Sequence, residues 1–122
     1  MQRNSNRRLA GNAAEDHAVE FLKEHSYKIL ERNYRSHFGE IDIIAMDNVH
    51  TVFIEVKSRS TWEFGSPHES IVRKKKRRIT LTALEYIQKK HLENKPLRFD
   101  VVAIKPDHSI ELIKNAFNAE YR

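Results

Sequence analysis

Cysteine is absent from the 122 residues of this sequence. Disulfide bonds, thiolate metal ligands and a cysteine nucleophile are therefore excluded together, and the chain is compatible with a reducing compartment. No apolar run approaches the roughly 20 residues that span a bilayer, and the N-terminal stretch MQRNSNRRLAGN lacks the apolar core of a signal peptide. We therefore expect a soluble, cytoplasmic protein with no membrane partner.

Histidine pairs at metal-ligand spacing are also absent, although the chain contains seven histidines. A histidine metal centre is therefore not predicted, and His37 is not expected to act as a catalytic base. A chain of this length can bury one core but not two. We expect a flexible basic arm over residues 1–8 and a single domain over residues 9–122.

Basic side chains outnumber acidic ones, with 22 Lys and Arg against 17 Asp and Glu and a net charge of +5 at pH 7. The pI calculated from the sequence is about 9.6. An excess of this sign makes polyanions plausible partners. Because the excess is modest, it does not by itself separate a nucleic-acid-binding protein from other soluble proteins.

Hydrophobic periodicity predicts the element order α-β-β-β-α-β-β. Apolar residues recur at helical spacing after Asn12, which can cap a helix ending near residue 25, and again over residues 70–91. Alternating side chains and β-branched residues predict the strands between and after these helices. The predicted strands cover residues 27–35, 40–46, 51–57, 97–105 and 109–113.

Acidic side chains interrupt the two most apolar strands, which form a predicted hairpin. If the hairpin closes symmetrically about residues 48–49, Asp42 lies opposite Glu55 and Glu40 lies opposite Lys57. Opposed residues on neighbouring strands have Cβ atoms about 4.5–5.5 Å apart. Two carboxylates at that separation can hold one divalent cation, which would offset the cost of burying both charges.

Two interpretations of these acids stay open at this stage. In the first, Asp42 and Glu55 bind a hard cation such as Mg²⁺ or Mn²⁺. In the second, they belong to a surface ladder of ion pairs with Lys57 and Arg59, each pair contributing about 0–1 kcal/mol. Exposed ladders usually alternate in sign, whereas here two acids are predicted to face each other.

Five sequence strings, in chain order, resemble the YraN family of small bacterial proteins over nearly the whole chain. The strings are GNAAEDHAVEFL, RNYRSHFGEIDIIA, FIEVKSRS, FGSP and RFDVVAI. The acid on one strand and the E-x-K on the next are similar to the PD-(D/E)xK nuclease superfamily and to archaeal Holliday junction resolvases. The resemblance implies an α/β protein with a restriction-endonuclease-like core, a mixed central sheet of about five strands flanked by helices.

The resemblance also implies roles for residues of the hairpin. Asp42 and Glu55 match the metal ligands of the superfamily, with the backbone carbonyl of Val56 as a third ligand and Mg²⁺ or Mn²⁺ as the metal. Lys57 matches the lysine that orients or activates the attacking water and steadies the phosphate.

Two further glutamates have alternative interpretations. Glu15 matches a glutamate that resolvases place near the start of the first helix, but a first-turn acid can also simply stabilise the helix dipole. Glu40 shares the predicted face of Asp42, so it is either an additional metal ligand or the partner of Lys57.

A basic run, RKKKRR, opens the second predicted helix. It is either a solvated helix surface or a set of phosphate contacts, which dominate nucleic-acid affinity. Lys76 lies on the apolar stripe of this helix and is therefore expected to point inward. The residues expected to contact nucleic acid are Arg35, Arg59, Lys74, Lys75, Lys76, Arg77 and Arg78.

Function is inferred chiefly from the resemblance. It implies a metal-dependent endonuclease that hydrolyses phosphodiester bonds of structured or branched DNA, with DNA favoured over RNA. The alternative is a nucleic-acid-binding protein with a nuclease-like fold and little or no catalysis, and a third hypothesis is an adaptor whose basic helix engages an acidic protein. A homodimer and a partner protein are both left open by the sequence.

Overall fold

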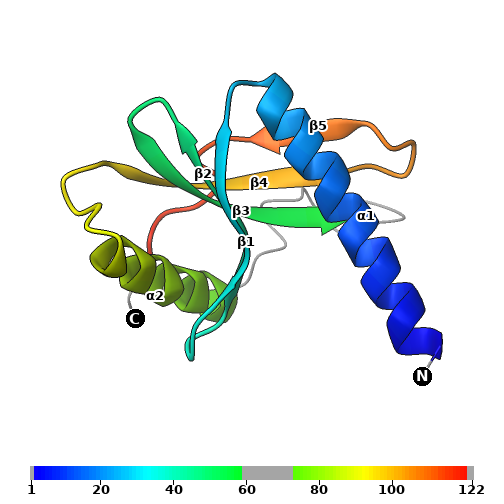
Figure 1. The fold of residues 1–122 in the computed structure, drawn as a ribbon, viewed down its shortest axis with the longest axis horizontal. Coiled ribbons are helices and arrows are strands. Elements are labelled where there is room, and N and C mark those ends of the chain that lie inside the picture. The colour runs from blue at the N-terminus through cyan, green and yellow to red at the C-terminus, as the bar shows by residue number, and fades with distance from the viewer. Residues whose placement is uncertain (1, 59–72, 121–122) are drawn as a thin grey trace.

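The computed structural model describes residues 2–58 and 73–120, with the side chains of residues 13–58 and 73–120. The elements, shown in Figure 1, are α1 (Gln2–Glu24), β1 (Lys28–Arg35), β2 (Glu40–Asp47), β3 (His50–Ser58), α2 (Arg73–Lys89), β4 (Leu97–Ile104) and β5 (Ile110–Ile113). This is the predicted order α-β-β-β-α-β-β. Within the described ranges, no helix combines the length and apolar character needed to cross a membrane.

Strand boundaries agree with the sequence prediction to within one or two residues, whereas the first helix is longer than predicted. α1 begins at Gln2 instead of after Asn12, so it includes the segment assigned to a basic arm. The flexibility of residues 1–8 stays a prediction. Arg59 and the loop expected before the second helix lie outside the described residues, and α2 is described from Arg73.

The five strands form one sheet in the order β1-β2-β3-β4-β5. β3 and β4 are parallel, and the other neighbours are antiparallel, which makes the sheet mixed as expected. A parallel pair needs a crossover connection, and α2 lies in the connection between β3 and β4. The two helices cover opposite faces of the sheet (Figure 1).

Each helix buries its own cluster of apolar side chains against the sheet. The cluster under α2 contains the predicted helix stripe together with sheet residues, namely Ile79, Ala83, Ile87, Ile44, Phe53, Phe99 and Val101. The cluster under α1 includes Ala18, Leu22, Val52, Ile54, Val102 and Ile104. Alternate residues of β3 and β4 fall in different clusters, as the two-residue period of a strand requires.

The hairpin register is the predicted one. The paired residues of β2 and β3 run from Ile43 opposite Ile54 to Asp47 opposite His50, so the turn lies at residues 48–49. One face assignment was wrong. Ile41 was predicted to lie with Ile43 on one face, yet it packs in the α2 cluster whereas Ile43 packs in the α1 cluster. The strand therefore changes its alternation at the intervening Asp42.

A buried polar network fixes the start of β4. The Arg98 Nε lies 2.9 Å from Asp100 Oδ1, and the Arg98 Nη2 lies 2.8 Å from Asp47 Oδ2. Asp100 also accepts hydrogen bonds of 2.9 Å from the Tyr27 hydroxyl and from the backbone N–H of Asn115. Arg98 and Asp100 therefore form a structural ion pair.

Candidate functional site

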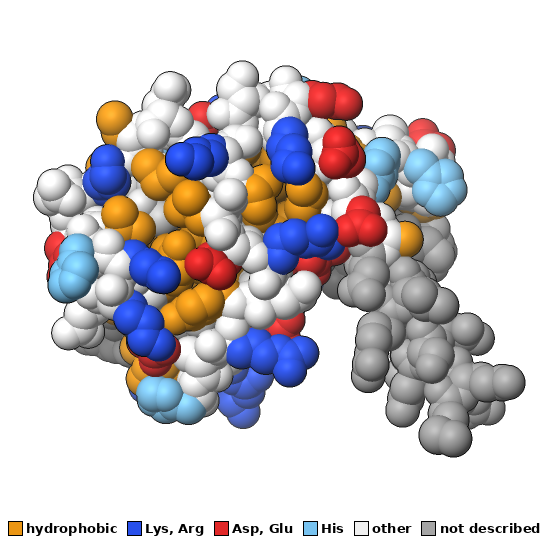
Figure 2. Space-filling view, in the orientation of Figure 1, with side chains coloured by type: hydrophobic (Ala, Val, Ile, Leu, Met, Phe, Trp, Pro, Cys, Tyr) orange, Lys and Arg blue, Asp and Glu red, His pale blue; other side chains and the backbone are white. Residues whose placement is uncertain are grey.

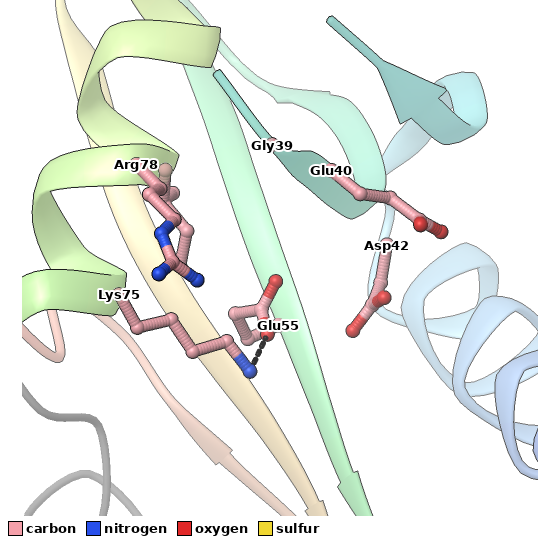
Figure 3. A pocket seen from close by; sticks show the side chains of 7 residues that line it. Gly39, Glu40, Asp42, Glu55, Lys75 and Arg78 are labelled. Atoms are coloured by element: carbon pink, nitrogen blue, oxygen red, sulfur yellow. Dashed lines mark ion pairs between the residues drawn. The ribbon is translucent and has the colours of Figure 1, made fainter. Parts of the chain in front are cut away.

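A cavity of about 410 Å³ opens between the hairpin and the N-terminal half of α2. It is lined by Gly39, Glu40, Asp42, Glu55, Lys75, Arg78 and Ile79. Figure 3 shows the carboxylates of Asp42 and Glu55 on neighbouring strands, with Lys75 and Arg78 reaching toward them from α2. The cavity therefore brings two strand acids together with two helix bases.

The side chain of Asp42 accepts a hydrogen bond from the backbone of the neighbouring strand. The N–H of Val56 donates to Asp42 Oδ2 at 2.9 Å. The backbone pairing of β2 with β3 ends at Ile43 and Ile54, so this side-chain hydrogen bond lies just beyond the end of the ladder. The change of alternation at Asp42 and this hydrogen bond together place its carboxylate beside β3. The role of the Val56 carbonyl as a ligand stays a prediction.

Burial dominates the electrostatics of the two acids. The pKa of Asp42 is raised to about 7 by burial first and by the negative charge of Glu55 second, while the hydrogen bond from the Val56 N–H opposes the rise. Burial also raises the pKa of Glu55, whose side chain is 6% exposed, and the nearby Lys75 ammonium opposes that shift. Ionising both carboxylates therefore requires a neighbouring positive charge.

Lys75, not Lys76, supplies the helix ammonium at the acidic pair. The Lys75 Nζ lies 2.9 Å from Glu55 Oε2. The Lys76 Nζ instead lies 5.8 Å from the centroid of the Phe117 ring, so it does turn toward the protein but away from the cavity. Both lysines are within about one turn of Ile79 on the buried stripe, and the way α2 sits on the sheet decides which one reaches Glu55.

The predicted catalytic lysine lies beside the cavity. Lys57 shares the face of β3 that carries Glu55, and its positive charge opposes the rise in the pKa of Glu55. It is not among the described residues that line the cavity. Glu40 does line the cavity, and its carboxylate lies 3.3 Å from the Arg35 guanidinium. Arg35 is therefore engaged with an acid at the rim.

Glu15 approaches the acidic pair from α1. Its side chain is buried, and its Oε1 accepts hydrogen bonds from Arg32 Nε at 3.0 Å and Asn33 Nδ2 at 2.9 Å. Its charge contributes to the raised pKa of Asp42, although it does not line the cavity. Because α1 begins at Gln2, Glu15 lies well inside the helix, and the interpretation as a first-turn acid that stabilises the helix dipole was wrong. A catalytic role for Glu15 stays a prediction.

The basic residues of α2 divide between the cavity and the surface. Lys74 and Arg77 are exposed, and Arg78 is exposed while its side chain lines the cavity. Figure 2 shows Lys and Arg side chains interspersed with Asp and Glu on this face instead of gathered in one uninterrupted basic area. The charge on the face drawn is therefore mixed.

The donor set of the cavity suits a hard cation with open coordination positions. No group of three or more His, Asp or Glu side chains that could hold a metal ion occurs within the described ranges. Asp42 and Glu55 are two oxygen donors, however, and Mg²⁺ is commonly bound by one or two carboxylates together with waters and substrate phosphates. The residues present therefore fit such a metal as part of its coordination.

Gly39 is a site residue that the sequence did not reveal. A Cβ atom at this position would lie 3.3 Å from the Cβ of Arg78 and 3.6 Å from Thr82 Oγ1. The same turn is joined to α2 by a 3.2 Å hydrogen bond between the hydroxyls of Ser36 and Thr82. The absence of a side chain at Gly39 therefore lets the turn approach the helix that carries the basic wall.

Gly39→Ala is expected to destabilise the protein by about 1–2 kcal/mol, because the added methyl group forces the turn and α2 apart. Urea unfolding followed by circular dichroism measures this cost. Val49→Ala is a matched control, since Val49 is 59% exposed at the hairpin turn and should change stability by less than about 0.5 kcal/mol. Equal stabilities of the two variants would contradict the close contact.

The family model and the similar proteins found by comparison carry the same family description. The family described as "Uncharacterised protein family UPF0102" matches residues 14–104. A UPF0102 protein of Persephonella marina is 48% identical over 113 residues, covering 93% of this chain and 97% of that protein. One of Sulfurihydrogenibium sp. is 49% identical over 110 residues, covering 90% and 95%. These descriptions name no activity.

Proposed function

We propose that this chain, which belongs to the uncharacterised protein family UPF0102, is a divalent-metal-dependent nuclease of the PD-(D/E)xK type. Its proposed substrate is structured or branched DNA, and its proposed cofactor is Mg²⁺ or Mn²⁺. One observation carries the proposal: the half-buried Asp42 and the buried Glu55 are neighbouring carboxylates with raised pKa values in a cavity with a basic wall. Strongly perturbed acids in a cleft are typical of functional sites.

A structural role alone accounts poorly for this pair. Two like charges in a buried site cost free energy that a surface ladder of ion pairs would not incur. Asp42 and Glu55 would hold the metal, with the Val56 carbonyl as the third ligand that the resemblance implies. When bound, the metal supplies a water of lowered pKa and positive charge for the phosphoryl oxygens.

The other residues of the site would orient the substrate. Lys57 lies two residues after Glu55 on the same face of β3, where its ammonium can steady the phosphate or the attacking water. Arg78 lines the cavity and can bind a phosphate oxygen through two N–H groups. The exposed Lys74 and Arg77 would contact flanking phosphates, which set affinity and register without reading sequence.

Metal binding tests the proposal directly. Calorimetric titration with Mn²⁺ is expected to show binding to the wild type and at least about tenfold weaker binding to Glu55→Gln, a loss of roughly 1.4 kcal/mol or more. Glu20→Gln, which changes an exposed carboxylate of α1, should bind like the wild type. A four-way junction, a duplex and single-stranded RNA incubated with each protein and Mn²⁺ identify the substrate class.

The ion pair between Lys75 and Glu55 favours a second candidate function, because it compensates one acid without any metal. In that case the chain is a nucleic-acid-binding protein with a nuclease-like fold and little or no catalysis. Binding of the junction or duplex by a wild type that takes up no Mn²⁺ and cleaves none of the three substrates would replace the first proposal with this one.

A further inference from the structure

The ammonium of Lys75 occupies the position next to Glu55 that a metal would need. Its Nζ lies 2.9 Å from Glu55 Oε2, and the two side chains are 45% and 6% exposed. Figure 3 shows this contact as the ion pair that bridges α2 and β3 across the cavity. Other cations of the same turn of α2 are engaged elsewhere, since Lys76 lies over the Phe117 ring and Arg73 lies 3.4 Å from Glu120.

A metal and an ammonium compete for the same carboxylate. A Mg²⁺ ion lies about 2.0–2.1 Å from its oxygen ligands, so the Lys75 Nζ at its present position would be a few ångströms from a doubly charged ion. Repulsion between unit charges at such distances amounts to several kcal/mol near a protein surface, at an effective dielectric constant of about 20. Lys75 must therefore leave Glu55 when a divalent cation binds there.

The open cavity leaves space for the Lys75 side chain after its displacement from Glu55. Lys75 has a flexible four-carbon stem and is nearly half exposed, so it can swing within the open cavity without unfolding α2. Arg78, three residues later on the same face of the helix, lines the cavity as well. The cavity that these two cations and the acids line has a volume of about 410 Å³, which is enough for an anionic group of the size of a phosphate.

We propose that Lys75 is an exchangeable counter-ion, which pairs with Glu55 in the metal-free protein and with a nucleic-acid phosphate once a divalent cation has replaced it. This inference rests on the proposed function, because it requires the metal to bind at Asp42 and Glu55. Metal and nucleic acid then bind cooperatively: the phosphate gives the displaced ammonium a new partner, and by linkage each ligand strengthens the other.

Metal affinity alone tests the first half of the exchange. Lys75→Met keeps the length of the side chain and removes its charge, so it is expected to bind Mn²⁺ about tenfold more tightly than the wild type in calorimetric titration without nucleic acid. Lys75→Arg restores the charge and should bind within about threefold of the wild type. Lys89→Met removes an exposed charge at the far end of α2 and should leave the affinity unchanged.

The salt dependence of duplex binding tests the second half. A phosphate contact contributes a slope of about −0.9 to a plot of log K against log salt concentration. With Ca²⁺ as the metal, the slope of the wild type is expected to be steeper than that of Lys75→Met by about this amount. Without a divalent cation the two slopes should coincide, because Lys75 is held on Glu55. Fluorescence anisotropy of a labelled duplex measures both.

The outcomes separate this inference from the proposed function. Equal Mn²⁺ affinities of the wild type and Lys75→Met overturn the exchange but leave the metal site standing. Equal slopes of the two proteins with Ca²⁺ overturn the transfer to phosphate. If neither the wild type nor Lys75→Met binds Mn²⁺, the metal site and the exchange both fail. Tighter Mn²⁺ binding together with a metal-dependent slope difference supports the exchange.

Discussion

Asp100→Ala is expected to lower the free energy of unfolding by about 3–5 kcal/mol, because it removes one partner of a buried ion pair. The Asp100 side chain is fully buried, and the Arg98 side chain is only 13% exposed. Three donors lose an acceptor at once: the Arg98 guanidinium, the Tyr27 hydroxyl and the Asn115 N–H. Urea unfolding followed by circular dichroism and by fluorescence measures the loss.

Asp16→Ala is the matched control, because it also removes an aspartate from an arginine ion pair. Asp16 lies 2.6 Å from Arg32, but its side chain is 65% exposed. Exposed pairs contribute at most about 1 kcal/mol, so this variant should be nearly as stable as the wild type. Similar small losses for both aspartates would show that the network around Arg98 is not important for stability.

The contribution of Asp42 to the stability of the metal-free protein is expected to fall as the pH rises from about 4 to about 7. The pKa of Asp42 is raised to about 7 in the folded state, whereas an unfolded chain releases this proton near its ordinary value of about 4. Over that interval the folded state holds one more proton than the unfolded state, so each increase in pH favours unfolding. Above pH 7 the effect is complete and constant.

Asp42→Asn removes this titration and is therefore expected to be more stable than the wild type above pH 7, by up to about 4 kcal/mol. The advantage should shrink as the pH is lowered and vanish near pH 4. Its amide oxygen can still accept the N–H of Val56. Urea unfolding of both proteins at several pH values gives the difference, and a constant difference across this range would contradict the raised pKa.

Mn²⁺ provides the control for that comparison. A ligand that binds only the folded state stabilises it. At ligand concentrations well above the dissociation constant, the gain in the free energy of unfolding grows with the logarithm of the ratio of the concentration to that constant. At pH 8 the wild type should gain stability with added Mn²⁺, and Asp42→Asn should gain little. Equal gains would place the cation somewhere other than at Asp42.

The sequence predicted the proximity of Asp42 and Glu55, because strand geometry is simple. Side chains alternate with a period of two, and a two-residue turn at residues 48–49 sets the register once the strands are recognised. Those facts predicted that Asp42 would lie opposite Glu55. In the structure the backbone pairing ends at Ile43 and Ile54, and the Asp42 side chain lies beside β3 through its hydrogen bond with the Val56 N–H. The order of helices and strands could also be predicted, since apolar residues recur with a different period in helices and in strands.

Features that depend on how elements pack could not be predicted in the same way. The choice between Lys75 and Lys76 depends on a small rotation of α2 about its own axis over the sheet. Ile41 packs in the same cluster as Ile44 because the alternation changes at Asp42, where a hydrogen bond to the Asp42 carboxylate follows the last backbone pair of the ladder. The close approach of Gly39 to α2 likewise depends on how the turn packs against the helix, and no local sequence pattern indicates it.

The two outer strands of the sheet limit how copies of this protein can associate. β1 carries four charged residues in the sequence KILERNYR, and its pairing with β2 is interrupted near Leu30. Asn33, with φ of 53°, distorts the same strand. β5, at the opposite edge, is short (Ile110–Ile113). Charges, irregularities and short length are the devices by which sheet edges resist backbone pairing with another chain. We therefore expect that two copies of the chain would not join their sheets by backbone pairing at either edge.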